Sequence, residues 1–264
     1  MDISFVEFDF TIVSVIFLLA VGFVLFRELH RWRKTLEFPP FQVFLLGINQ
    51  LYCRLWCHLS CKQPAVFPDN GGAIVISNHV SSVDPMVLQC GSSRILSYFI
   101  AKEYHDVVGL GWLYKQNGCI PVNRTGKDMA AIRAGIRHLR KGGVIAIFPE
   151  GQINQNGYGL LPGRAGTALL ALRSRVPIVP AVVVGAPKGD SLVKPIITPS
   201  RITVKYGEPL DLTPYYDTSG NRDTLQKVTD IMMSEIAKLG DSLGADMSPV
   251  THQETGKTPA RAVS

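Results

Sequence analysis

The sequence lacks a cysteine framework. Its 264 residues contain an odd number of cysteines with no framework spacing: Cys53, Cys57, Cys61, Cys90 and Cys119. Disulfide-stabilised secreted domains usually carry an even number of cysteines, so this pattern argues against that class and favours reduced thiols that face the cytosol. No pair has the C-x2-C spacing of a structural zinc site.

Charged residues and nucleotide-binding motifs are also scarce. Charged residues make up 18% of the chain, and the net charge of +6 suits nucleic acid, anionic lipid or a phosphorylated substrate. No helix-turn-helix, zinc-finger or RNA-binding signature occurs, so a nucleic-acid partner is not expected. No P-loop occurs, and Gly109-Leu110-Gly111 lacks the third glycine and acidic partner of a dinucleotide site. We therefore expect no cofactor and no metal.

One long run of the sequence carries no charge. Phe10 to Phe26 comprises 17 residues, FTIVSVIFLLAVGFVLF. As a helix it would reach ~25 Å at a rise of 1.5 Å per residue. A bilayer core measures about 30 Å, so the run barely spans it or lies deep in one leaflet. A buried core helix is the alternative, but a soluble helix of this length usually has a polar face.

Basic residues follow this run directly: Arg27, Arg31, Arg33 and Lys34. By the positive-inside rule the rest of the chain then lies on the cytoplasmic face of a membrane. The same residues can contact an anionic membrane surface. A cleavable signal peptide is disfavoured because its basic residues would precede the apolar run.

A second helix is predicted after Pro39-Pro40. Gln42, Asn49, Gln50, Arg54 and His58 form its polar side, and its other side is apolar at helical spacing: Phe41, Phe44, Leu45, Ile48, Leu51, Tyr52, Leu55 and Leu59. The helix either lies in the membrane interface or packs on the following domain. Cys53, Cys57 and Cys61 form an i, i+4, i+8 stripe on its more polar side. A metal or acylation role is open, but small semi-buried residues at a helix contact are favoured.

From Ala73 onward, strand-like runs alternate with helical patterns. The predicted strands are 73–77, 96–101, 119–123, 144–148, 178–185 and, more weakly, 202–206, and the predicted helices are 127–141, 163–175 and 225–239. This alternation predicts an α/β fold with a mostly parallel or mixed sheet flanked by helices. We divide the chain into N-terminal membrane-anchoring helices (1–62), a main domain (63–244) and a polar, disordered tail (245–264).

A histidine and an aspartate follow the first predicted strand. In Ser77-Asn78-His79-Val80-Ser81-Ser82-Val83-Asp84-Pro85, His79 can accept a proton from an alcohol, and Asp84 can reach back to orient it. Loops after strands hold reactive groups in open α/β sheets. The alternative is a surface histidine and an aspartate that caps the helix beginning at Pro85.

Three further fragments end strands or begin helices. Phe148-Pro149-Glu150-Gly151 closes a strand, and Glu150 either holds substrate, orients a cation or lies in solvent. Arg124 ends another strand and can pair with phosphate. Arg164 precedes a helix whose N-terminus can receive an anion. A solvated side chain is the alternative for Glu150 and for Arg124.

Together these fragments resemble the glycerolipid acyltransferase family, of the 1-acylglycerol-3-phosphate (lysophosphatidate) acyltransferase type. Four blocks occur in the family's order: N-H-x4-D at Asn78, His79 and Asp84; glycine to arginine at Gly118 to Arg124; F-P-E-G at 148–151; and V-P-I-V-P at 176–180. The resemblance covers somewhat under half of the chain.

The resemblance implies direct acyl transfer. His79 would deprotonate an acceptor hydroxyl, Asp84 would orient His79, and the alkoxide would attack the thioester of acyl-CoA or acyl carrier protein. It also implies substrate binding by Asn78, Arg124, Glu150, Gly151 and Arg164. No G-x-S-x-G elbow supports a covalent serine route.

One block departs from the family pattern. The family usually continues F-P-E-G with Thr-Arg-Ser, whereas Gln152-Ile153-Asn154 follows here. That arginine is generally taken to help bind the phosphate of the acceptor, so Arg124 and Arg164 are candidates to share its role. Glycerol 3-phosphate, another lysophospholipid or a lyso-aminolipid stay open as acceptors, as does a non-catalytic lipid-binding protein.

Overall fold

The structure is a computed structural model that describes residues 21–23, 40–68, 70–105, 110–123, 128–155, 159–189 and 191–249. The predicted membrane segment, apart from helical residues 21–23, lies outside these ranges, as do the basic residues after it and Arg124. In the ranges it covers, no helix has the length and apolar character needed to cross a membrane.

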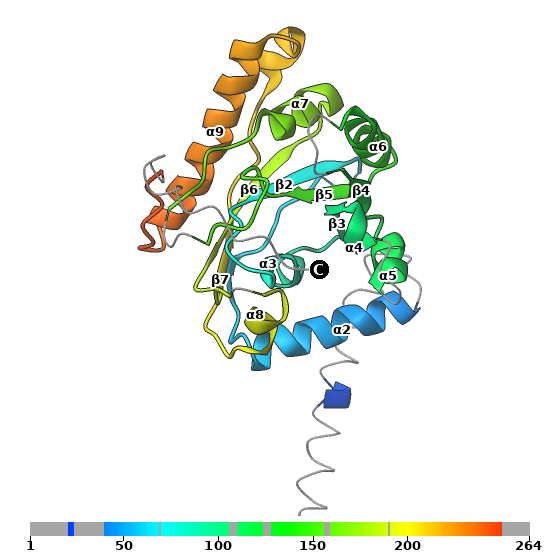
Figure 1. Ribbon diagram of the computed structural model, residues 1–264, viewed down its shortest axis with the longest axis vertical. Helices are drawn as coiled ribbons and strands as arrows, with labels where there is room; N and C mark the ends of the chain where they lie inside the picture. Colours follow the sequence, from blue (N-terminus) through cyan, green and yellow to red (C-terminus); the bar gives the residue numbers. More distant parts are fainter. Residues whose placement is uncertain are drawn as a thin grey trace, which may run out of the picture.

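The described residues form one mixed sheet in the order β1-β7-β6-β2-β5-β3-β4 (Figure 1). Neighbouring strands run parallel except at the β6–β7 pair, which is antiparallel. The bounds are β1 (Ser60–Gln63), β2 (Ala73–Ser77), β3 (Leu96–Ala101), β4 (Ile120–Val122), β5 (Val144–Ile147), β6 (Ile178–Val184) and β7 (Thr203–Tyr206). The six predicted strands are confirmed. The polar strand β1 was missed because its side chains are largely exposed.

Helices cover both faces of the sheet. They are α2 (Pro40–Leu55), α3 (Asp84–Cys90), α4 (Lys102–His105), α5 (Leu110–Gln116), α6 (Met129–Arg140), α7 (Ala165–Ser174), α8 (Val193–Ile197), the 3-10 helix η1 (Thr213–Thr218) and α9 (Arg222–Asp241). Successive strand residues point to opposite faces, so in β2 Ile74 and Ile76 pack against α6, α7 and α9, whereas Val75 packs in the core shared with α2 and α3. Figure 1 shows these two layers. The predicted α/β class is confirmed.

Helix α2 packs on the sheet domain, but not by the side that its apolar residues predict. Val43, Gln50 and Cys53 are buried, whereas Phe41, Phe44, Ile48 and Leu55 are 45–59% exposed. The core therefore takes a side of the helix that includes Gln50 and Cys53, and much of the predicted apolar side faces outward, although Tyr52 packs against the core. The cysteines predicted to form a stripe on the more polar side of this helix do not continue along it: Cys53 and Cys57 are buried, but Cys61 lies in β1. Their role as buried residues at a helix contact is confirmed for these two.

The ends of the main domain extend beyond the predicted bounds. Strand β1 pairs with β7 and begins at Ser60, inside the range assigned to the anchoring helices. The first residues of the tail that was predicted to be disordered, 245–249, are instead packed on the domain. Met247 is only 6% exposed and packs in the core, and Pro249 forms a bridge with Leu160. Apolar burial orders residues that composition alone marks as tail.

Candidate active site

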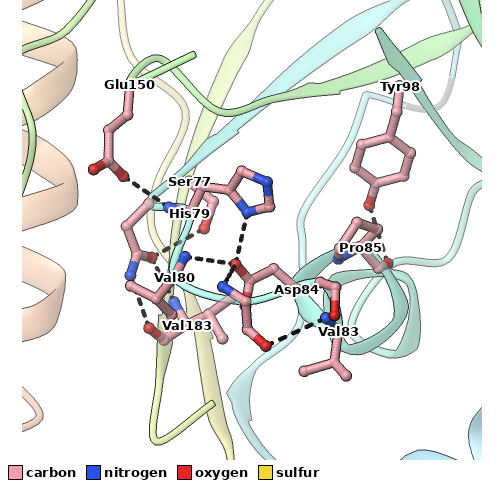
Figure 2. A network of polar contacts seen from close by, with 12 residues as sticks. Ser77, His79, Val80, Val83, Asp84, Pro85, Tyr98, Glu150 and Val183 are labelled. Carbon is pink, nitrogen blue, oxygen red and sulfur yellow. Dashed lines mark hydrogen bonds and ion pairs between the residues drawn. The ribbon is translucent and has the colours of Figure 1, made fainter. Parts of the chain in front are cut away.

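Two motif blocks meet at the carboxyl edge of the sheet. Strands β2 and β5 are parallel neighbours, with Ile76 opposite Ile147, so the residues that follow them emerge side by side. The backbone N–H of His79 donates to Glu150 Oε1 at 2.7 Å, and the His79 carbonyl accepts from Asn154 N at 2.7 Å. Figure 2 shows His79 between Glu150 and Asp84. The loop after β5 thus fixes the main chain of His79 from both sides.

Asp84 orients the imidazole of His79. The His79 Nδ1–H donates to Asp84 Oδ2 at 2.8 Å, and the same oxygen accepts from Val80 N at 2.7 Å and Ser81 N at 2.8 Å. The carboxylate is fully buried, and the His79 side chain is 17% exposed. None of the described residues bonds Nε2 of His79. This arrangement directs a basic nitrogen outward, as a general base requires. The alternative of a surface histidine and an aspartate that caps the next helix does not fit this geometry, because Val83 is the N-cap of α3 and Asp84 binds His79.

Aromatic rings fix the plane of the imidazole. The Phe148 ring stacks on the His79 ring, with centroids 3.9 Å apart and planes 10° apart. The ring of Tyr98, in β3, stacks with Phe148 at a centroid distance of 6.0 Å. The Tyr98 hydroxyl donates to the Pro85 carbonyl at the start of α3. Sequence reasoning identified the F-P-E-G block without a role for Phe148. The signal available was a large apolar residue at the exit of a strand next to the histidine strand.

Glu150 contacts main chain rather than open space. It is 2% exposed, and its second oxygen accepts from Leu161 N at 2.9 Å. Burial raises the pKa of Glu150 to about 7, against the two backbone hydrogen bonds, which act to lower it. In this structure the Glu150 carboxylate is enclosed and positions the His79 backbone, and its predicted contact with substrate or a cation stays a prediction.

Asn78 likewise binds main chain. It is 1% exposed, its Nδ2 donates to the Val183 carbonyl at 2.9 Å, and its Oδ1 accepts from Val183 N at 2.8 Å. The side chain therefore extends the pairing of β2 and β6 by one rung. Both ends of the Asn78 amide are thus bonded to Val183, and its predicted contact with substrate stays a prediction.

Arg164 lies against the turn after Glu150. Its backbone N–H donates to the Pro149 carbonyl at 2.8 Å, and it is the N-cap residue of α7. A Cβ on Gly151, whose φ is +70°, would lie 2.6 Å from the Arg164 Cδ and Nε atoms. The structure therefore brings Gly151 and Arg164 together with His79's loop, and leaves Arg164 exposed. Within the described ranges, no group of His, Cys, Asp and Glu is suited to hold a metal ion.

The sequence of this site matches a known family. Residues 58–184 match the family model described as Acyltransferase, a range that contains His79, Asp84, Glu150 and Arg164. This region, just under half of the chain, is similar to the acyltransferase family. The match begins just before β1 and ends with β6, so it contains every described strand of the sheet except β7, together with the site.

Several relatives of this protein bear the name 1-acyl-sn-glycerol-3-phosphate acyltransferase. The one from Bacillus subtilis is 24% identical over 67% of this chain and 85% of its own length. The one from Limnanthes alba is 30% identical over 66% of this chain and 62% of its own. The human 1-acyl-sn-glycerol-3-phosphate acyltransferase beta is 29% identical over 56% of this chain and 54% of its own length. The chain thus spans most of the bacterial relative and under two thirds of the other two.

A solved structure shares the fold. It is the 1-acyl-sn-glycerophosphate (LPA) acyltransferase PlsC from Thermotoga maritima, with a TM-score of 0.62 and 19% identity. The similarity covers 90% of this chain and 95% of that one.

Proposed function

We propose that the chain transfers a fatty acyl group from acyl-CoA or acyl carrier protein to the hydroxyl of 1-acylglycerol-3-phosphate, giving phosphatidic acid. The observation that carries the proposal is the 2.8 Å contact of His79 with buried Asp84 at the carboxyl edge of the sheet. The names of the relatives support the acceptor. We also propose that the protein acts at a membrane, with this domain on the cytoplasmic face.

The chemistry follows from the geometry of the histidine. Because Nδ1 donates to Asp84, Nε2 carries the lone pair and removes the proton of the acceptor hydroxyl. The oxygen attacks the thioester carbonyl, the C–S bond breaks, and the proton passes from His79 to the leaving thiolate. Asp84 stabilises the imidazolium between these steps. A positioned base of this kind typically contributes about 10²–10⁴-fold to the rate.

Acyl transfer by the purified protein in detergent tests this proposal. Lysophosphatidate is offered with acyl-CoA or acyl carrier protein, and His79→Ala and the exposed His58→Ala are run in parallel. Turnover by wild type and His58→Ala, with loss of about 10²-fold or more in His79→Ala, is expected. Equal turnover by the two variants would remove His79 from its role as base.

A different head group on the acceptor is the second candidate. Ile153 stands where the family usually carries an arginine, which weakens the case for a phosphate monoester. Glycerol 3-phosphate, other lysophospholipids and lyso-aminolipids are therefore offered in the same assay. Lipid binding without turnover on any acceptor would favour a non-catalytic lipid-binding protein instead.

A further inference from the structure

Exposed apolar side chains are concentrated on one part of the molecule. The structure describes twelve large hydrophobic residues as exposed, and nine of them lie on or beside α2, α5 and α8. We call these nine residues the apolar face: Phe41, Phe44, Ile48, Leu55, Trp56, Trp112, Leu192, Val193 and Ile197. A concentration of this kind on a folded domain marks an interaction surface.

The three helices of the apolar face lie next to one another although they are far apart in sequence. The rings of Phe41 and Trp112 join α2 to α5, with centroids 5.2 Å apart. The Tyr52 hydroxyl of α2 donates to the Ile196 carbonyl of α8 at 2.7 Å. In Figure 1, α8 and α5 flank the two ends of α2. These contacts link the three helices that carry the apolar face.

The charges on these helices have a single sign. Helices α2, α5 and α8 contain no aspartate or glutamate, and each contains one basic residue: Arg54, Lys115 and Lys194. Aromatic and aliphatic side chains beside lysine and arginine, without acidic residues, suit the boundary between acyl chains and anionic head groups. The uncharged run 10–26 precedes α2 in the chain, which favours the same lipid partner over a second copy of the protein.

The segment that carries α8 is bonded to the catalytic loop. The hydroxyl of Ser81 donates to the Pro187 carbonyl at 2.6 Å, and that of Ser82 donates to the Leu192 carbonyl at 2.7 Å. The backbone N–H of Ser81 also binds Asp84 Oδ2. Two hydroxyl groups therefore connect the loop that holds His79 and Asp84 to Pro187 and Leu192, which precede α8 in the chain.

We propose that α8 is a lipid contact separate from α2 and the N-terminal run, and that it holds the His79 loop at the level of the head groups of an anionic bilayer. This contact does not depend on the proposed function, whereas the use of this position to reach a lipid acceptor rests on it. Helix α8 is the informative element because it contacts the bilayer independently of the N-terminal run.

Fluorescence quenching by brominated lipid tests the contact in the full chain. The three tryptophans, Trp32, Trp56 and Trp112, are replaced by phenylalanine. Ile197→Trp and, separately, Val193→Trp are then introduced as the sole fluorophore. Met129→Trp is the matched control, because Met129 is 47% exposed on α6 and is not part of the apolar face. Each variant is reconstituted in phosphatidylcholine–phosphatidylglycerol vesicles with and without brominated acyl chains, and its fold is checked by circular dichroism.

Loss of most of the emission of Ile197→Trp or Val193→Trp, with little loss for Met129→Trp, is the expected result. Equal quenching at all three positions, or quenching at none of them, would overturn the proposal. Dimerisation in detergent that shields Ile197→Trp from an aqueous quencher, without quenching by lipid, would assign the face to a second copy and also overturn it. These readouts need no turnover, so failure of the acyl-transfer assay leaves them interpretable.

Discussion

At His79, a short loop makes most of the polar contacts. Asp84 Oδ2 receives three N–H groups from residues within five positions of it, and only the Glu150 and Asn154 contacts come from elsewhere in the chain. The geometry of the histidine and the aspartate is therefore formed within one short turn, which directs two backbone N–H groups and the imidazole toward one carboxylate. This explains why the pair was predictable from sequence.

The buried carboxyl group of Glu150 should make the free energy of unfolding depend on pH. Its pKa in the fold is about 7, above the ordinary value of 4.5, because burial disfavours the carboxylate. The folded state then holds a proton that the unfolded state releases, so the free energy of unfolding falls as pH rises from 4.5 to about 7, by up to about 3 kcal/mol. Urea unfolding across this range should show that slope in wild type and a flatter one in Glu150→Gln. Parallel pH profiles of the two proteins would show that Glu150 stays ionised.

Arg164 predicts an effect on acceptor binding. Its side chain lies over Gly151 beside the catalytic loop, where the guanidinium can donate hydrogen bonds to a phosphate group. We expect Arg164→Ala to raise the KM for lysophosphatidate by about tenfold with little change in kcat, as for the loss of one charge-assisted hydrogen bond. Arg173→Ala, on the exposed side of the same helix, is the control and should leave KM unchanged. A fall in kcat without a change in KM would contradict the phosphate role.

At the scale of elements, the site depends on which strands are neighbours. The side chain of Asn78 continues the β2–β6 pairing, and we expect Asn78→Ala to leave the Val183 N–H and carbonyl buried without partners. The free energy of unfolding should fall by about 2–4 kcal/mol. Asn221→Ala, which removes the exposed N-cap of α9, should cost about 1 kcal/mol. Denaturant unfolding measures both. Equal losses would mean that water replaces Asn78 without penalty.

Helix α2 shows where a sequence pattern is ambiguous. Its amphipathic spacing predicted a helix correctly, and the helix does pack on the domain, but the side that it buries includes Gln50 and Cys53. Asn49 explains part of this, because its amide donates to the Met86 carbonyl of α3. A hydrophobic pattern locates an apolar stripe and does not say whether protein or lipid covers it.

At the scale of the whole molecule, the apolar face and the catalytic loop predict a dependence on the physical state of the substrate. Two apolar side chains that become buried in lipid contribute several kcal/mol to membrane binding. We therefore expect the double variant Val193→Glu/Ile197→Glu to lower turnover of lysophosphatidate in anionic vesicles by about tenfold or more. Turnover of a short-chain, dispersed lysophosphatidate should stay near wild type. Met129→Glu is the matched control for an added charge. A similar loss on both substrates would indicate damage to the fold rather than lost docking.

The sequence by itself determined the α/β class, most strand positions, the His79–Asp84 pair and the family resemblance, because these depend on short-range spacing and on motifs read in order. Only the tertiary structure decided that Glu150 and Asn78 bind main chain, that residues 245–249 pack on the core, and that α2, α5 and α8 share one apolar face. These features depend on contacts between segments far apart in the chain: the Asn78–Val183 pair is separated by 105 residues and the Tyr52–Ile196 pair by 144. Such contacts follow from strand order and packing, which local periodicity does not encode.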